Sequence, residues 1–369
     1  GGLLQCRQQP ARWPGDHSGR RQLLSGFVDD RIAGRFAQKA LATAASEGVI
    51  LLHRNTVTNE NPMLNRRTLL ATAVCLAVSA FPAHAQEKIS VVASFSILGD
   101  FVKEIAGDRA IVTTLVGADG DAHVYSPTPA DAKAVAEAKV LVINGLKFEG
   151  WMDRLVKSSG TKASVVTTSK GTTPIALSGE KEDRHGHDHA GQSDPHAWQD
   201  VANARRYVAA IRDGLIAADA AGKAIYEANA AAYLAKLDGL DADIRAEIAR
   251  IPADRRKVIT SHDAFGYFAK AYGISFIAPQ GVSTEAEASA KDVARIIRQV
   301  KAQKIPAVFM ENVTNPRLAE QIARETGAKM GGRLYSDALS AGTGPAGTYI
   351  LMMRHNIREL GKALGTGPV

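Results

Sequence analysis

Residues 89–116, ISVVASFSILGDFVKEIAGDRAIVTTLV, contain two short apolar segments separated by a helical pattern. Ile89–Ala93 and Ala110–Val116 are rich in β-branched residues, which favour extended strands. Between them, Leu98–Ala106 carries apolar residues three and four positions apart, as on one face of a helix. A strand, a helix and a second strand in this order predict a parallel sheet covered by helices.

The alternation continues through residue 167. Strands are predicted at Val140–Ile143 and Ala163–Thr167, and a helix at Trp151–Lys157. Another helix is expected to begin after Thr128, which can cap it, because Pro129 suits the first turn and Asp131 lies near the positive end of the dipole. These elements predict a first α/β lobe over residues 86–200.

A long helical region follows. Asp200 is a candidate N-cap, Val201–Ala218 and Gly222–Ile251 are Ala-rich and periodic, and Pro252 ends the pattern. We assign residues 201–255 to a helical connection that includes a long linker helix. The polar stretch at 178–193 has no apolar period and predicts a mobile, His-rich loop within the first lobe.

A second series predicts a C-terminal lobe over residues 256–369. Strands are expected at Val258–Thr260, Ile274–Ala278, Ala307–Met310 and Ala328–Met330, with helices at Ser289–Val300, Pro316–Thr326 and Tyr349–Leu364. The predicted fold class is therefore α/β, with two lobes that each hold a parallel sheet flanked by helices. One long rigid helix joins the lobes.

The charge of the chain is unevenly distributed. The 369 residues are 45% hydrophobic and 22% charged, which is typical of a globular protein, and their net charge is +7. Residues 1–85 hold ten Lys/Arg and five Asp/Glu, which leaves 35 and 33 for residues 86–369. A net charge of +2 over that part gives little support to nucleic-acid binding.

Residues 63–85, MLNRRTLLATAVCLAVSAFPAHA, have the three parts of a signal peptide. Arg66 and Arg67 form the positive region, an apolar stretch follows, and Ala83-His84-Ala85 is a cleavage site. The double arginine also permits a twin-arginine route. Cys75 lies inside the apolar stretch, which makes it a poor lipid acceptor, so we expect a soluble periplasmic protein.

Residues 1–62 show no clear periodicity, and we interpret them as a non-native or disordered upstream segment that does not contribute to the fold. The mature chain would begin near Gln86. Since Cys6 and Cys75 both precede it, the mature chain would contain no cysteine, as suits an oxidising compartment. Any metal site must then be built from histidines and carboxylates.

Four residues follow predicted strands at the edge where ligands bind in parallel sheets: His123, His196, His262 and Asp337. Two belong to each lobe, so a cleft between the lobes could join them. Each also has an ordinary interpretation: His123 as a solvated loop residue, His262 as a buried structural residue, and His196 and Asp337 as helix caps. Flanking residues are interpreted as supporting or capping groups (Asp194, Asp263, Glu311), and His355 as a surface or packing residue.

His185, His187 and His189 lie in the predicted loop, in the sequence HGHDH. This composition is biased towards metal binding, so we expect weak binding and hypothesise that the loop captures metal and passes it inward. A solvated loop without a role is the alternative.

From Lys88 to Leu364 the chain resembles the metal-specific solute-binding proteins of ABC importers (cluster A-I, ZnuA-like family), most closely the zinc branch. The resemblance is carried by HVYSPTPADAK, NGLKFEGWMDRL, DPHAWQD with its preceding His-rich insert, SHDAFGYFAKAYGI and LYSDALS. It implies that His123, His196, His262 and Asp337 are ligands. Manganese-selective relatives commonly have Glu where this chain has His262, which favours zinc while leaving manganese as an alternative.

The ligand chemistry agrees with this resemblance. Three imidazoles and one carboxylate form a tetrahedral set that suits Zn²⁺, whereas Mn²⁺ prefers an oxygen-rich octahedral shell. A zinc hydrolase is the alternative from another class, but four protein ligands leave no open position and no HExxH motif is present. The expected partners are an ABC permease with its ATPase and a periplasmic zinc chaperone. We expect a monomer whose rigid helix limits the lobes to small shifts.

Overall fold

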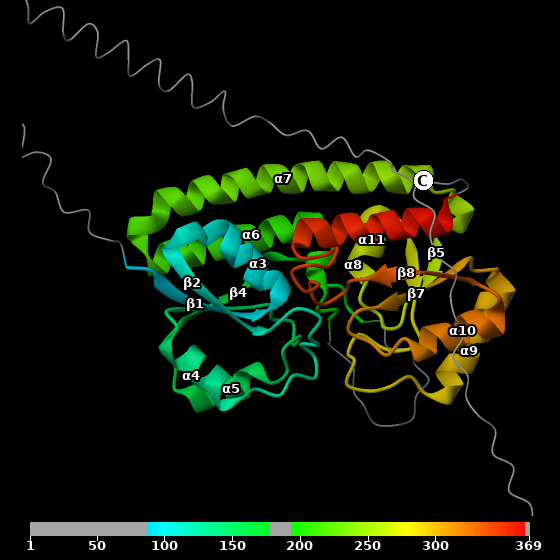
Figure 1. The fold of residues 1–369 in the computed structure, drawn as a ribbon, viewed down its shortest axis with the longest axis horizontal. Helices are drawn as coiled ribbons and strands as arrows, with labels where there is room; N and C mark the ends of the chain where they lie inside the picture. The colour runs from blue at the N-terminus through cyan, green and yellow to red at the C-terminus, as the bar shows by residue number, and fades with distance from the viewer. Residues whose placement is uncertain (1–86, 178–192, 366–369) are drawn as a thin grey trace, which may run out of the picture. The chain divides into compact units, whose positions relative to one another are not determined.

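The computed structural model describes residues 87–177 and 193–365. The upstream segment 1–62, the signal peptide 63–85 and the loop histidines His185, His187 and His189 lie outside the described residues. Within them are two sheets of four parallel strands with helices packed around them, so the predicted α/β fold class is confirmed (Figure 1).

The first sheet has the strand order β2-β1-β3-β4. Its strands are β1 (Ile89–Phe95), β2 (Ala110–Val116), β3 (Val140–Ile143) and β4 (Ser164–Thr167), and its connecting helices are α3 (Ser96–Ala106), α4 (Pro129–Glu137) and α5 (Met152–Ser159). The central strand β1 is almost fully buried, because helices cover both of its faces. Thr128 and Asp131 form the reciprocal cap that begins α4.

The second sheet has the equivalent order β6-β5-β7-β8. Its strands are β5 (Lys257–Ile259), β6 (Ser275–Ile277), β7 (Ala307–Glu311) and β8 (Lys329–Leu334). The helices in this half are α8 (Gly266–Tyr272), α9 (Ala290–Gln303), α10 (Arg317–Thr326) and α11 (Tyr349–Leu364). A separate apolar cluster that includes Ile259, Ile296, Val308 and Ile322 packs α9 and α10 against the sheet.

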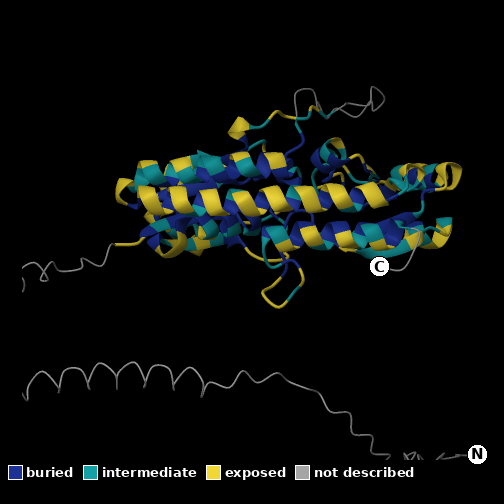
Figure 2. Cartoon of the chain, turned by 90° about the horizontal axis from the view of Figure 1, so that it is seen from above, coloured by how far each residue is buried: buried dark blue, intermediate teal, exposed yellow. Residues whose placement is uncertain are grey.

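Two long helices connect the halves: α6 (Val201–Ala218) and α7 (Lys223–Arg250). The buried residues of α7 recur every three or four positions, so a single face of this helix is covered. That face contacts α3 from the first half and α11 from the second, while exposed residues line the outer side (Figure 2). Because the same helix packs against both halves, it restrains their separation.

Most predicted elements agree with the structure to within two residues, but three differ, one of them α9, which was predicted to end at Val300 and ends at Gln303. Helix α8 was not predicted, because its seven residues, GYFAKAY, form too short a pattern to be distinguished from a loop. The last strand was predicted at 328–330 and extends to Leu334, because Gly331-Gly332 obscures the strand pattern in the sequence.

The predicted boundaries of the lobes, 86–200, 201–255 and 256–369, stay a prediction, since one apolar core runs from β1 to α11. Among the helices of residues 87–177 and 193–365, none has the length and apolar character needed to cross a membrane.

Candidate metal centre

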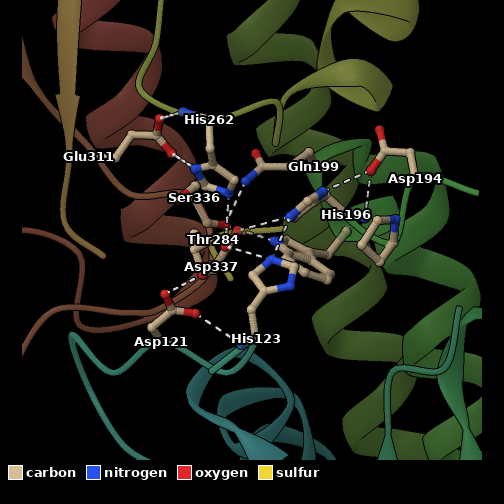
Figure 3. A network of polar contacts seen from close by, with 12 residues as sticks. Asp121, His123, Asp194, His196, Gln199, His262, Thr284, Glu311, Ser336 and Asp337 are labelled. Atoms are coloured by element: carbon tan, nitrogen blue, oxygen red, sulfur yellow. Dashed lines mark hydrogen bonds and ion pairs between the residues drawn. The ribbon is translucent and has the colours of Figure 1, made fainter. Parts of the chain in front are cut away.

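His123, His196, His262 and Asp337 converge on one point in the described part of the chain. Each offers one ligand atom, and these atoms all lie within 4.8 Å of one another. His123 Nε2 lies 3.3 Å from His196 Nε2, and His262 Nε2 lies 3.1 Å from Asp337 Oδ2. Oδ2 of Asp337 is also 3.4 Å from His123 Nε2, while its Oδ1 is 3.5 Å from His196 Nε2 (Figure 3).

The topology explains this convergence. His123 follows β2, His196 follows β4, His262 follows β5 and Asp337 follows β8. All four strands are parallel to their neighbours, so their carboxyl ends lie along one edge of each sheet. The side chains of His196, His262 and Asp337 are fully buried, and His123 is 9% exposed. The centre is thus assembled from both halves and is shielded from solvent.

Two buried carboxylates orient two of the imidazoles. Asp194 Oδ1 lies 2.8 Å from His196 Nδ1, and Glu311 Oε2 lies 2.7 Å from His262 Nδ1. The second oxygen of Glu311 accepts the amide N–H groups of Ser261 and His262 at 2.7 and 3.0 Å. With the proton held on Nδ1, Nε2 presents its lone pair to the centre.

Asp194 and Glu311 thus occupy the supporting positions that the sequence suggested for them. Asp263 differs: it is exposed, and its backbone N–H donates to the carbonyl of Gly281. His355 lies away from the centre, where its Nε2 donates to the carbonyl of Arg333 and its ring packs on Tyr335. That placement agrees with its interpretation as a packing residue.

The pKa shifts of the cluster follow from burial and from the shared carboxylates. Burial lowers the pKa of His123, and Asp337 only partly offsets this effect. Burial also disfavours charge on His196, but Asp337 and Asp194 outweigh it and raise its pKa to about 9. For His262 burial is likewise outweighed, by Glu311 and Asp337, and its pKa rises well above the usual value. Burial would raise the pKa of Asp337, but the facing histidines hold it well below its usual range. The carboxylate is therefore ionised and able to bind a cation.

Aromatic rings enclose the imidazoles. The ring of Phe148 lies 4.6 Å from that of His123 and 4.8 Å from that of Trp198, between centroids. Trp198 Nε1 and Gln199 Nε2 both donate to the carbonyl of Ser336, at 2.9 and 2.7 Å, which fixes the residue before Asp337. These contacts exclude water and so strengthen electrostatic interactions within the centre.

A tight turn places Phe148. Gly145, Leu146 and Lys147 have φ angles of +86°, +54° and +62°, a left-handed conformation that is unfavourable for the two non-glycine residues. Buried Glu149 stabilises the turn, because its carboxyl group accepts Ser94 Oγ at 2.6 Å and the amide N–H of Asn144 at 2.7 Å. Burial raises the pKa of Glu149 despite these bonds.

Sequence reasoning missed the roles of Phe148, Glu149, Trp198 and Gln199. The signal available for Glu149 was a single acidic residue between Phe148 and Gly150, within NGLKFEG. Such a signal does not identify what the acid contacts.

A cavity of about 340 Å³ lies beside the centre. Its lining includes His123, Phe148 and Lys147 from the first half and Val282 and Glu285 from the second. Of the four converging residues, His123 is the one that lines this cavity. It therefore lies on the side from which an ion can approach.

Residues 91–363 match the family described as "Zinc-uptake complex component A periplasmic" (ZnuA). The chain belongs to this family. The manganese-binding lipoprotein MntA of Halalkalibacterium halodurans is 36% identical over 288 residues, which cover 78% of this chain and 92% of that protein. The iron-binding protein YfeA of Yersinia pestis is 35% identical over 284 residues, covering 77% and 89%.

The fold is also shared with a solved relative. The periplasmic zinc-binding protein TroA of Treponema pallidum superposes with a TM-score of 0.69 at 31% identity, covering 76% of this chain and all of that one. This ZnuA-family chain is thus the metal-binding, substrate-binding component of an ABC importer, exposed outside the cytoplasmic membrane. It is not an enzyme, which removes the zinc-hydrolase alternative. Its importer implies a permease and an ATPase as partners.

Proposed function

We propose that this ZnuA-family protein binds one Zn²⁺ between His123, His196, His262 and Asp337 and delivers it to the permease. The observation that supports this most directly is the convergence of three imidazoles and one carboxylate within 4.8 Å. Nitrogen-rich sets of four ligands suit tetrahedral Zn²⁺. The ion is the cargo of the protein.

The surroundings of the centre support the same proposal. Histidines that bind metal in proteins commonly donate their second ring N–H to a carboxylate, which raises ligand basicity and fixes ring orientation. Asp194 and Glu311 occupy this position beside His196 and His262. The rings of His196 and His262 are thus already oriented to coordinate an ion.

Manganese is the second candidate, and the relatives give it support. MntA is named as a manganese-binding protein, YfeA as an iron-binding one and TroA as a zinc-binding one, so relatives of similar identity differ in metal. Against manganese stands the ligand set, since Mn²⁺ favours oxygen ligands and more of them.

We further propose that the mature protein begins near Gln86 after removal of residues 63–85 and acts as a soluble periplasmic monomer. MntA is a lipoprotein, so a lipid-anchored form is the competing arrangement. A periplasmic chaperone and the loop histidines His185, His187 and His189 are proposed to load the site. Mass spectrometry of protein from the native periplasm distinguishes a free N-terminus near Gln86 from a lipid-modified cysteine.

Competition between metals tests the central proposal. Metal-free protein is equilibrated with a chromogenic chelator and titrated with Zn²⁺ or Mn²⁺. We expect one tight zinc site and weaker manganese binding. Ala variants at His123, His196 and His262 should lose this site, whereas His355→Ala serves as the control that keeps it. Tighter binding of Mn²⁺ than of Zn²⁺, or a tight site that survives all three substitutions, would refute the proposal.

A further inference from the structure

The carboxylate of Asp121 joins the backbone of His123 to the second half of the molecule. Its Oδ1 accepts the backbone N–H of His123 at 2.9 Å. Its Oδ2 accepts the hydroxyl of Thr284 at 2.5 Å, across 163 residues of sequence. Figure 3 shows Asp121 beside His123 and below Thr284, with a contact to each. The side chain of Asp121 thus connects the proposed ligand His123 to Thr284 in a loop of the second half.

The segment that carries His123 is also fixed within the first half. The indole Nε1 of Trp151 donates to the carbonyl of Ala122 at 2.7 Å. Residues 121–123 are therefore held on one side by Trp151 and on the other by Thr284. A change in the spacing of the two halves must either break the Thr284 bond or move His123.

Thr284 lies in a loop that is itself tied to a second proposed ligand. This loop connects β6 to α9, and within it Gly281 accepts the backbone N–H of Asp263 at 3.2 Å. Gln280 forms a parallel bridge with His262. Through this loop the Asp121 carboxylate links the backbone of His123 to that of His262, so one ligand from each half is coupled.

His123 is held less firmly at its ring than its counterparts. The imidazoles of His196 and His262 each have a carboxylate at Nδ1. The polar contacts of the His123 ring are made through Nε2, and the ring also packs edge-on with that of Phe148. His123 also lines the cavity. The position of the His123 ring therefore depends strongly on the backbone of His123, whose N–H donates to Asp121.

We infer that the Asp121–Thr284 hydrogen bond is a positioning contact that retains the ion by holding His123 in place across the two halves. This inference rests on the proposed function. A hydroxyl that donates to an ionised carboxylate makes one of the stronger hydrogen bonds in proteins. Breaking it leaves residues 121–123 held by Trp151 of the first half but not by the second half, so His123 can shift towards the cavity and open the coordination shell on its accessible side. The contact acts on release more than on capture, because it holds in place a ligand that already coordinates the ion.

The test measures how fast bound Zn²⁺ is released. The full chain is loaded with Zn²⁺ alone, mixed rapidly with excess chelator, and followed by chelator absorbance. Thr284→Val keeps the shape of the side chain and removes the donor, and Thr284→Ser restores it. Ser283→Ala is the matched control, since it removes a neighbouring hydroxyl that accepts the amide of Glu285 in the same loop.

Thr284→Val should release Zn²⁺ about ten-fold faster than wild type, as expected for the loss of a hydrogen bond to a charged group. Thr284→Ser and Ser283→Ala should release it at the wild-type rate. The association rate and the melting temperature of the metal-free protein should not change, which separates positioning from loss of structure. In the double variant Asp121→Ala/Thr284→Val, release should be no faster than in Asp121→Ala alone, because both remove the same contact.

Two results would overturn the inference: wild-type release from Thr284→Val, or effects of the two substitutions that multiply. Both results are measured on variants that still bind Zn²⁺, so neither would contradict the proposed function. Failure of the wild-type chain to bind Zn²⁺ would instead overturn the proposed function and this inference with it.

Discussion

Glu311 lies 2.7 Å from Nδ1 of His262 and accepts the backbone N–H of the same residue, so one carboxylate fixes both the ring and the chain of this histidine. The pair is fully shielded from solvent. It connects β7 to the loop after β5, which are neighbours in the second sheet. The orientation of His262 is therefore determined by strand pairing as well as by its own loop.

Glu311→Gln should weaken Zn²⁺ binding about 10–100-fold, because the amide keeps an acceptor for the backbone but no longer favours the tautomer that exposes Nε2. Affinity is measured by chelator competition. Glu320→Gln, on the exposed surface of α10, is the control. Unchanged zinc affinity in Glu311→Gln would show that the carboxylate does not support the ligand.

Replacement of His262 by Glu should shift selectivity towards Mn²⁺, since it exchanges a nitrogen ligand for oxygen. The new carboxylate would face Glu311, so the double variant His262→Glu/Glu311→Gln avoids repulsion between like charges. We expect the ratio of Mn²⁺ to Zn²⁺ affinity to rise in the double variant, measured by parallel titrations. The control His355→Glu should leave the affinity ratio as in wild type. A wild-type ratio in both His262→Glu and His262→Glu/Glu311→Gln would contradict the selectivity argument.

Zinc affinity should increase with pH towards about 9, because the pKa of His196 is raised to about 9 and a bound ion must displace that proton. Where binding of the ion displaces one proton, zinc affinity should fall about ten-fold for each unit by which the pH is lowered. The same shift has the opposite effect on the metal-free protein. A raised histidine pKa contributes stability that is present below about 6.5 and is lost as pH rises through about 9.

Both trends can be measured between pH 6 and 9, as zinc affinity in buffers that do not bind metal and as metal-free melting temperature. An affinity that stays flat across this range would rule out ligation by protonatable histidines. His196→Ala should flatten the stability trend of the metal-free form.

Asp100→Asn should stabilise the metal-free protein at pH 8 by about 3 kcal/mol, since its pKa rises from 3.8 to about 6 and one pKa unit corresponds to about 1.4 kcal/mol. Burial raises the pKa of Asp100 to about 6, even though its carboxylate accepts the backbone N–H of Tyr349 at 2.8 Å. A raised carboxyl pKa favours the folded state at acid pH, and this contribution is lost as pH rises through about 6. Asparagine keeps the acceptor oxygen without the charge.

Denaturant unfolding at pH 5 and pH 8 provides the measurement, and the gain should be smaller at pH 5. The exposed Asp108→Asn is the control. Equal effects of the two substitutions at pH 8 would mean that burial of Asp100 is not the cause.

Deletion of residues 180–192 should leave one tight zinc site and abolish weaker secondary binding, because this segment contains His185, His187 and His189. Calorimetric titration with Zn²⁺ measures the stoichiometry before and after deletion. The same secondary stoichiometry after deletion would count against a role of the loop in capture.

Local patterns predicted most of the fold. The cap formed by Thr128 and Asp131, the N-cap Asp200 and the bounds of α11 were readable because each depends on residues within one or two turns. The strand β8 was predicted too short, because its extension depends on pairing with β7, whose ladder shifts register between Val308 and Met310. Gly331 lies there against the ring of Phe309, where a larger side chain would not fit.

The sequence by itself determined which residues could bind a metal, since the two cysteines precede the predicted mature chain and histidines with an aspartate follow the strands. It also determined the order of strands and helices, because these obey short-range periodicity and capping. Only the tertiary structure decided which carboxylate supports which imidazole, that Phe148 and Trp198 enclose the centre, and that Asp121 reaches Thr284. These contacts join residues far apart in the chain, whose distances are set by the packing of two sheets against shared helices rather than by neighbours in sequence.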